Sequence, residues 1–490
     1  MSLLIVTVSA TAQEAAQQSK VGGEITQDTV WRGQVTVDRD IIISGATLTI
    51  ESGTRVSFSP TETTAARIIL DGGREAPAVL RIEGTAERPV LLTTEPGKPP
   101  GSIIVPAASS RHWRDRKPMA TAHGSILASH TTFQGLGETT PSAQGISGRG
   151  PAIHLQLTDP TDELKLTASR FRSCGPVMAN FVDDKCSVVI HGCSFEESLD
   201  SVAVRLYGSG RGPRVFEGNR ADAAFQVLAG PAWFTDNVLI GPHACLAVAG
   251  PEAGESRIQS NYVHSSGDQD DGRFCLDCSA ADAVVEGNVL RGGTWVIQRT
   301  GTALRGNVLA GRDGLLSKSL GIRTTTHHLI ASLPAGAQVL DNVLLGPSYS
   351  HLATSEGCRG VLVRNNVFDG GGISGRAVHL NTLAREAVAA RVESNVFAGF
   401  KDVAVYDEAR LPDAVQVCRR NVIAETPRAC DLAVEVCKEW GETTREALGY
   451  PSPSAIDWGD IEAQLLAGER TVAEVIGSIK ARYPLPQGSP

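Results

Sequence analysis

The chain has 490 residues and a formal net charge of −9, with 51 Gly, 25 Pro and only 20% charged residues. This turn-rich composition is typical of a β protein, and 41% hydrophobic residues are enough for a continuous core. An acidic chain offers no uniformly basic surface, which argues against a nucleic-acid-binding protein.

The first segment, residues 1–20, is predicted to be a signal peptide and leader. An apolar run at residues 3–8 precedes Ala10 and Ala12, which form an A-x-A cleavage site. No Lys or Arg precedes the run, so a frayed terminus is the alternative. No other apolar run approaches 18–20 residues. We therefore expect a secreted or periplasmic protein without a membrane span.

A basic segment, RHWRDRK, follows at residues 111–117. Its arginines could pair with the carboxylates or sulfates of an acidic glycan, while the indole stacks on a sugar face. The predicted substrate-binding residues are Arg111, Trp113, Arg114 and Arg116. A solvated insertion is the alternative, and we favour it.

A five-residue phrase, Asn-Val-(Leu/Phe)-x-Gly, recurs through the second half of the chain. It starts at Asn237, Asn288, Asn307, Asn342, Asn366 and Asn395. Looser copies start at Asn219, Asn261 and Asn421, and HGCSF places Cys193 in the same frame. From Asn219 to Asn421 the chain advances 202 residues in 8 steps, about 25 residues each, which indicates stacked repeat units.

The residues around each anchor Asn predict short strands rather than helices. The third residue before the anchor is apolar or Cys, and the second residue after it is apolar or, once, Ala. Two inward side chains with Asn between them fit two strands that meet at a bend, because Asn tolerates the left-handed conformation. Stacked coils would align the amides into a ladder along the axis. The predicted ladder residues are Asn219, Asn237, Asn261, Asn288, Asn307, Asn342, Asn366, Asn395 and Asn421.

On these phrases, the chain resembles the secreted right-handed parallel β-helix proteins of the pectin-lyase-like superfamily. Residues 29–58 and 81–94 also look like the opening coils of such proteins. The resemblance covers roughly residues 29–437 and implies an all-β, right-handed parallel β-helix. We therefore expect one solenoid domain over residues 21–437, including N-terminal capping coils.

An acidic loop, SSGDQDDGR, lies between two of the predicted coils. Its Asp268, Asp270 and Asp271 faintly resemble the paired aspartates of polygalacturonases, and a Ca²⁺ loop is also open. The N-T-D and G-H-G motifs of polygalacturonases are absent from the sequence, and no carboxylates align with the loop in the adjacent coils. We treat these residues as candidates for substrate binding but favour a solvated loop.

A second candidate site lies on the strand after that loop. Alignment of successive segments places Asp277, Arg299 (or Gln298), Lys318 and His379 on one outer face, with Asp407 further along. Such a row could neutralise a uronate carboxylate and supply a base for its C5 proton. These are the predicted catalytic residues. A one-residue slip would turn them to the other face, and an ordinary solvated surface is the favoured alternative.

The cysteines give little support for a metal site. Cys275 and Cys278 form a C-x-x-C without a second pair at zinc spacing. Cys193 and Cys418 occupy positions that other coils fill with Asn or Val. A disulfide among Cys418, Cys430 and Cys437 would pin the last coil, and the sequence leaves it open.

The C-terminal tail, residues 438–490, changes to helical character. Residues 457–466 predict one helix, and Thr471 with Glu474 forms a capping box that opens another helix, which ends at Pro484. We expect this tail to cap the open end of the solenoid, because an uncapped stack exposes strand edges.

Two classes of function remain. The first, which we favour, is a glycan- or surface-interacting scaffold without an evident catalytic constellation. The second is a polysaccharide lyase, glycoside hydrolase or epimerase that acts on an acidic, uronate-containing polysaccharide. No cofactor is evident, although Ca²⁺ remains open, and the expected partner is an acidic polysaccharide or a cell-surface component.

Overall fold

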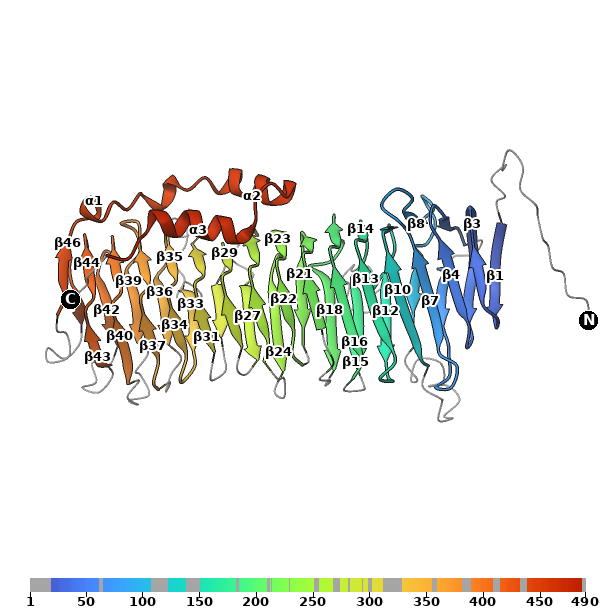
Figure 1. Cartoon of the computed structure of the whole chain (residues 1–490), viewed down its shortest axis with the longest axis horizontal. Helices are drawn as coiled ribbons and strands as arrows, with labels where there is room; N and C mark the ends of the chain where they lie inside the picture. Colours follow the sequence, from blue (N-terminus) through green and yellow to red (C-terminus); the bar gives the residue numbers. More distant parts are fainter. Residues whose placement is uncertain are drawn as a thin grey trace, which may run out of the picture.

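The protein forms a long solenoid of successive coils. The computed structural model describes residues 19–60, 65–106, 122–137, 150–181, 185–208, 212, 214–228, 230–250, 255–267, 274–280, 283–292, 294–297, 302–311, 328–354, 359–380, 389–408, 415–431 and 439–486. Coils follow one another along a single axis from β1 to β46 (Figure 1). The chain is a right-handed parallel β-helix, as predicted from the repeated Asn phrase.

Coils supply strands to three stacks, in which the strands of successive coils pair in parallel. The first stack consists of β2 (Thr29–Trp31), β4 (Thr47–Glu51), β7 (Ala78–Glu83), β10 (Gly124–Ser129), β13 (Glu163–Thr167), β16 (Ser187–His191), β19 (Arg214–Glu217), β22 (Trp233–Thr235), β25 (Arg257–Gln259), β28 (Val284–Glu286), β31 (Ala303–Arg305), β34 (Gln338–Leu340), β37 (Leu362–Arg364), β40 (Ala390–Glu393) and β43 (Val415–Arg419).

The second stack follows the anchor residues. It consists of β5 (Arg55–Phe58), β8 (Val90–Thr94), β11 (Thr131–Gln134), β14 (Arg170–Arg172), β17 (Ser194–Glu196), β20 (Arg220–Ala221), β23 (Val238–Gly241), β26 (Tyr262–Ser265), β29 (Val289–Arg291), β32 (Val308–Ala310), β35 (Val343–Leu345), β38 (Val367–Asp369), β41 (Val396–Ala398), β44 (Val422–Ala424) and β46 (Gly441–Thr443).

The third stack completes each coil. It consists of β6 (Arg67–Leu70), β9 (Ser102–Ile104), β12 (Ile153–Leu157), β15 (Val177–Phe181), β18 (Val202–Gly208), β21 (Ala224–Val227), β24 (Leu246–Gly250), β27 (Phe274–Ala280), β30 (Thr294–Ile297), β33 (His328–Leu333), β36 (Ser350–Thr354), β39 (Arg376–Leu380), β42 (Val403–Asp407) and β45 (Cys430–Asp431). At the N-terminal end, β1 (Ser19–Ile25) pairs with β3 (Gln34–Ile43), which itself pairs with both β5 and β6.

The core lies inside the coils, where the sequence pattern predicted it. Phe216 and Leu239, three residues before one anchor and two residues after the next, are both fully buried, as are their counterparts in most coils. Cys193 and Cys418 are buried at the positions expected from the alignment, and Cys418 pairs with Val392 in the preceding coil.

The bend in each coil differs from the prediction in one respect. The left-handed residue is the one before the anchor and not the anchor Asn itself, for example Asp236, Ser260 and Asp341, with φ of 54°, 54° and 57°. The expectation that Asn adopts this conformation is therefore wrong. The anchor side chain is instead committed to bonds along the stack.

All nine predicted ladder residues are buried and linked by hydrogen bonds. The side-chain amide of Asn307 donates to Asn342 Oδ1 at 2.9 Å and to the Val285 carbonyl at 2.9 Å. Its own Oδ1 accepts from the backbone N–H and from Nδ2 of Asn288, at 2.9 and 3.0 Å. The ladder satisfies backbone donors that the bend would otherwise leave buried without partners.

Helices follow the last coils: α1 (Arg445–Leu448), the 3₁₀ helix η2 (Pro453–Ala455), α2 (Trp458–Ala467) and α3 (Val472–Arg482). The predicted capping box is present, because Thr471 Oγ1 accepts from the Glu474 N–H and Glu474 reaches back to the Thr471 N–H. Asp457 caps α2, which ends at left-handed Gly468. Both helices therefore match the sequence prediction.

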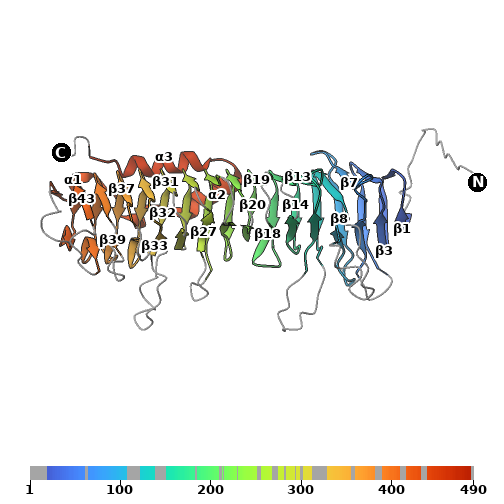
Figure 2. The same cartoon turned by 90° about the horizontal axis from the view of Figure 1, so that it is seen from below.

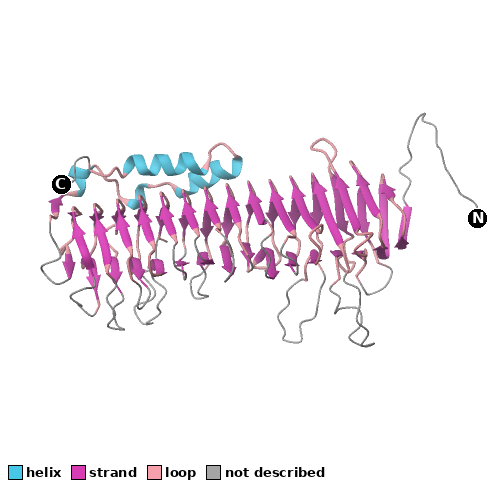
Figure 3. Ribbon diagram, turned by 60° about the horizontal axis from the view of Figure 1, so that its bottom comes forward, coloured by secondary structure: helices cyan, strands magenta, loops and turns pink. Residues whose placement is uncertain are grey.

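The helices lie along the flank of the solenoid and not across its end (Figures 1 to 3). They cover the outer face of the second stack between β23 and β44. Apolar side chains of α2 and α3 pack on a row of outward-facing residues: Val238, Tyr262, Val289, Val308, Val343, Val367, Val396 and Val422. This position differs from the expected end cap, and we call the covered row the flank stripe.

Two polar anchors hold the C-terminal segment to the flank. Glu462 of α2 accepts from Tyr262 Oη at 2.7 Å and pairs with His264 and Arg291 at 2.8 Å each. Burial favours the protonated acid, but the bonds from His264 and Tyr262 outweigh it and lower the pKa of Glu462. At the other end, Arg445 pairs with fully buried Asp369.

Among the cysteines, Cys430 is disulfide-bonded, whereas Cys418 is a free thiol. Cys275 and Cys278 of β27 are also buried thiols. In the described part of the chain, no helix is long and apolar enough to cross a membrane.

Candidate functional site

A cluster of ionisable and aromatic side chains lies on the third stack, where β33, β36, β39 and β42 follow one another. His379 of β39 pairs with Ala353 of β36 and with Tyr406 of β42. Tyr349 lies just before β36, and Arg376 begins β39. We call Tyr349, Arg376, His379 and Tyr406 the His379 cluster.

The side chains of the His379 cluster are in mutual contact. The Arg376 guanidinium lies 3.6 Å from the centre of the Tyr406 ring and 5.1 Å from that of Tyr349. The His379 ring lies 5.3 Å from Tyr406 and 6.4 Å from Tyr349, between centroids. Tyr349 is 45% exposed, so one wall of the cluster faces solvent. The cluster combines a cation held over aromatic faces with a largely buried imidazole.

His379 is neutral at physiological pH. Burial, and to a smaller extent the Arg376 charge, lower the pKa of His379 to about 4, although the nearby Asp407 opposes this shift. Its Nε2 lies 3.3 Å from Glu408 Oε2. A positive charge on the ring would therefore be opposed by burial and stabilised by Glu408.

His351 supports the turn behind the cluster. It is fully buried, and its Nε2 bonds the Gly346 carbonyl at 2.9 Å, while its ring packs edge-on against Phe400. Burial lowers its pKa to about 4, against 6.5 for an ordinary histidine.

This shift predicts acid sensitivity. The unfolded chain takes up the proton near pH 6.5 and the folded protein only near pH 4, so stability is full above pH 6.5 and falls as pH decreases toward 4. His351 alone should lower the unfolding free energy by roughly 2 kcal/mol between pH 7 and 5. Denaturant titrations should show a shallower pH dependence for His351→Gln, even if that variant is less stable at pH 8. An equal slope in both proteins would contradict this role.

Of the predicted catalytic residues, the structure places Asp277 and His379 in the same outer row but four coils apart, roughly 19 Å at the usual spacing. Val296 and Ala331 occupy rungs between them. The structure therefore does not bring the two side chains together. Arg299 and Lys318, with Gln298, lie outside the described residues, as do Arg111, Trp113, Arg114, Arg116, Asp268, Asp270 and Asp271.

Asp407 does not face outward as expected. It is 0% exposed and pairs with inward Leu380, so Tyr406 is the residue that follows His379 in the outer row. The strand that succeeds β30 is β33, with Ile330 opposite Trp295, and not the segment around Lys318 used in the sequence alignment. The sequence alignment therefore lacked β33 and β36, the two strands that precede β39 in the third stack.

Sequence reasoning missed Tyr349, Arg376, Tyr406 and Glu408. Arg376 and Tyr406 stand in the aligned segments RAVHLNT and VAVYDEA, so the sequence alignment could have predicted that they lie near His379. Tyr349 was not, because β36 was not recognised as a separate coil. Among the described residues, no group of three or more His, Cys, Asp or Glu side chains could hold a metal ion.

Comparisons with known proteins find only distant structural similarities. No family model matches the chain, and no curated protein matches it. A mannuronic-acid-specific family 6 polysaccharide lyase from human gut microbiota is 11% identical, with 88% of this chain and 100% of that chain covered and a TM-score of 0.32. The periplasmic alginate epimerase AlgG (11% identity, 88% and 78% covered, TM-score 0.17) and the Azotobacter vinelandii mannuronan C-5 epimerase AlgE6 A-module (11%, 86% and 90%, 0.17) are also similar. At these TM-scores the similarities carry no argument about substrate or reaction, which must come from the His379 cluster.

Proposed function

We propose that this chain is an extracytoplasmic β-helix protein that binds an acidic, uronate-containing polysaccharide at the His379 cluster. One observation carries the proposal: Arg376 lies over two tyrosine rings, one of them exposed, beside a neutral histidine. The guanidinium can pair with a uronate carboxylate through two parallel bonds, and Tyr349 offers a flat face for the sugar ring. Membership in the pectin-lyase-like superfamily remains part of this proposal, supported by the anchored phrases.

Export is the second part of the proposal. The apolar run at residues 3–8 and the A-x-A site at Ala10 and Ala12 support a cleaved signal peptide. The disulfide at Cys430 fits an oxidising compartment.

The test is binding of uronate oligosaccharides, measured by calorimetry on the full chain. Arg376→Ala should weaken binding about tenfold or more, because a bond between charged groups contributes about 1.5–3 kcal/mol. The affinity of Arg376→Lys should lie between those of the wild type and Arg376→Ala, because lysine keeps the positive charge but cannot form the two parallel hydrogen bonds of a guanidinium. Arg364→Ala is the matched control, because Arg364 is exposed on β37 of the first stack.

A neutral glycan of equal length should bind weakly to every variant. Equal affinities of the wild type and Arg376→Ala for the uronate would sink the proposed site.

A second function, catalysis, is favoured by the neutral state of His379. A neutral imidazole can accept the C5 proton of a uronate whose carboxylate is neutralised by Arg376, and the imidazolium formed would be stabilised by Glu408. Elimination would then break the C4–O bond and leave a double bond between C4 and C5, and the departing oxygen would take a proton from water. Formation of unsaturated products, or inversion at C5 seen by NMR, that disappears in His379→Ala would establish this function. Unchanged substrate would leave binding as the function.

A further inference from the structure

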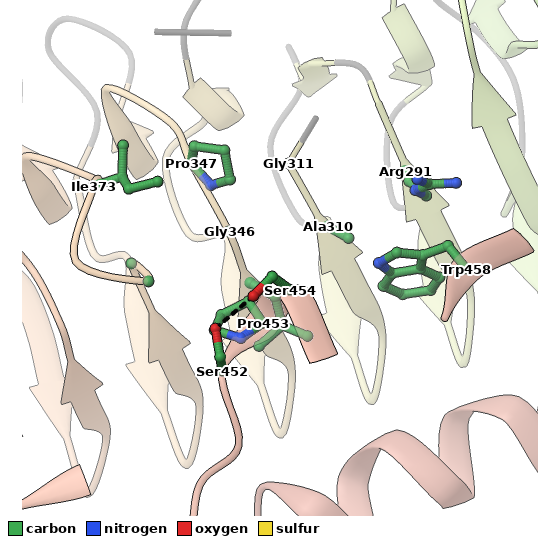
Figure 4. A pocket seen from close by; sticks show the side chains of 13 residues that line it. Arg291, Ala310, Gly311, Gly346, Pro347, Ile373, Ser452, Pro453, Ser454 and Trp458 are labelled. Carbon is green, nitrogen blue, oxygen red and sulfur yellow. Dashed lines mark hydrogen bonds between the residues drawn. The ribbon is translucent and has the colours of Figure 1, made fainter. Parts of the chain in front are cut away.

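A pocket lies at the corner between the second and third stacks, where the C-terminal segment meets the solenoid. It is a partly open cavity of about 80 Å³. Pro347 and Ile373 line it from the solenoid, and Ser452, Ser454 and Trp458 from the C-terminal segment (Figure 4). Two parts of the chain that are far apart in sequence therefore build one concavity.

The chemistry of the pocket suits a neutral, hydroxyl-rich ring. Ser452 and Ser454 are exposed, and their hydroxyls are 2.8 Å apart. Arg291 also lines the pocket, but its guanidinium pairs with Glu462 at 2.8 Å and lies 5.4 Å from the Trp458 ring. Its charge is thus already neutralised. The walls offer hydroxyls and apolar surface from Ile373, which is 44% exposed, but no free charge for a carboxylate.

The pocket is continuous with the His379 cluster along the chain. Pro347 stands two residues before Tyr349, and Ile373 three residues before Arg376, so two turns line the pocket and then lead into the cluster. These turns are tied together, because Ser374 Oγ donates to the Gly346 carbonyl at 2.9 Å and accepts from the Ser348 N–H at 3.0 Å. A glycan chain seated on the cluster can therefore continue into a fixed pocket one turn away.

We infer that this pocket is a second glycan subsite, which binds a neutral face of a sugar residue in the same chain whose uronate occupies the His379 cluster. The inference rests on the proposed function. It gives the C-terminal segment a role beyond packing, since Ser452 and Ser454 supply one wall of the subsite.

The test uses calorimetry to compare oligosaccharides of increasing length in which one uronate is joined to neutral sugar residues. Ser454→Phe fills the pocket, and Ile373→Ala removes part of the opposite wall. Both should lower affinity for long oligosaccharides about tenfold, equivalent to the loss of one or two hydrogen bonds and their surrounding contacts. Both should leave the shortest oligosaccharide that binds unaffected. Ala455→Phe is the matched control, because Ala455 is exposed in the same 3₁₀ helix and does not line the pocket.

Each outcome decides between the two sites. Wild-type affinity of both pocket variants at every length would overturn the subsite while leaving the proposed function intact. If no uronate oligosaccharide binds the wild-type protein, the proposed function fails and this inference falls with it. A loss that is equal at all lengths would also overturn the subsite, because it would indicate damage to the His379 cluster.

Discussion

Replacement of Asn307 by Ala is expected to lower the unfolding free energy by about 3 kcal/mol, because it leaves buried polar groups without partners. The change removes four bonds, two in which Asn307 Oδ1 accepts from Asn288 and two donated by Asn307 Nδ2. The buried backbone N–H of Asn288 then has lost the acceptor that the ladder supplied. Few single substitutions in a solenoid should have a larger effect.

The measurement is the denaturation midpoint, together with hydrogen exchange at the Asn288 amide. Asn180→Ala is the matched control, since Asn180 is half-buried on β15 and its side chain bonds only that of Gln156, at 3.2 Å, among the described residues. It should shift the midpoint little. Asn307→Ser should lose less than Asn307→Ala, because at an earlier rung Ser169 Oγ accepts from the Thr131 N–H at 3.3 Å. Equal losses in Asn307→Ala and Asn180→Ala would show that the ladder does not stabilise the coil.

The fold could be predicted from the sequence because its determinants repeat locally. Each anchor Asn carries its own buried neighbours at fixed offsets, so one coil predicts the next. The bend was predicted less well. Its left-handed residue varies among Gly, Asp, Ser and Asn and even Arg420, and this variation hides the position from a search for identical residues.

The covered flank had a signal in the sequence that sequence reasoning did not use. The second residue of each phrase, Val in most copies, alternates with the inward residue and must therefore face outward. An outward row that is apolar in coil after coil predicts a strand buried on both faces. In earlier coils the same row holds Ser194 and Arg170, which the helices do not cover. The change of this row from polar to apolar residues near Val238 marks the coil at which the helices begin to cover the flank.

The His379 cluster could be predicted only in part, because its members come from several coils joined by connections of unequal length. The step from Asn307 to Asn342 is 35 residues, whereas that from Asn219 to Asn237 is 18. An alignment of the coils at their anchor residues therefore does not fix which residues pair in the third stack. The segment around Lys318 was aligned in place of β33 and β36, so Tyr349, which lies just before β36, was not placed beside His379.

Removal of the Arg445 side chain is expected to release the C-terminal segment from the flank. Asp369 is fully buried on β38, where its Oδ1 accepts from the Gly371 N–H at 2.9 Å and its other oxygen pairs with Arg445. Burial already raises the pKa of Asp369 against the opposing effect of Arg445. Arg445→Ala leaves this carboxyl group without its counter-charge, which costs about 3–5 kcal/mol in comparable buried pairs.

The loss should appear as local opening, because the helices are attached to the solenoid by the flank stripe and by few polar anchors. Once released, the segment exposes Val367, Val396 and Val422, each of which contributes roughly 1.5 kcal/mol or more when buried. We expect increased binding of a hydrophobic dye and faster proteolysis between residues 444 and 486, while the β-sheet circular dichroism is retained. Arg482→Ala, a change of the same kind at an exposed position of α3, should behave as wild type.

The double variant Asp369→Asn with Arg445→Gln separates charge from packing. It removes both charges together, so no uncompensated carboxylate remains, and it should recover most of the stability that Arg445→Ala loses. If the double variant opens as readily as Arg445→Ala, the contacts of the arginine stem and its bond to the Pro451 carbonyl hold the segment, and the buried charge does not. Packing contacts would then hold the C-terminal segment on the flank, and release of the segment would show little dependence on pH. If the double variant recovers the stability that Arg445→Ala loses, the buried ion pair is the interaction that keeps the flank stripe covered.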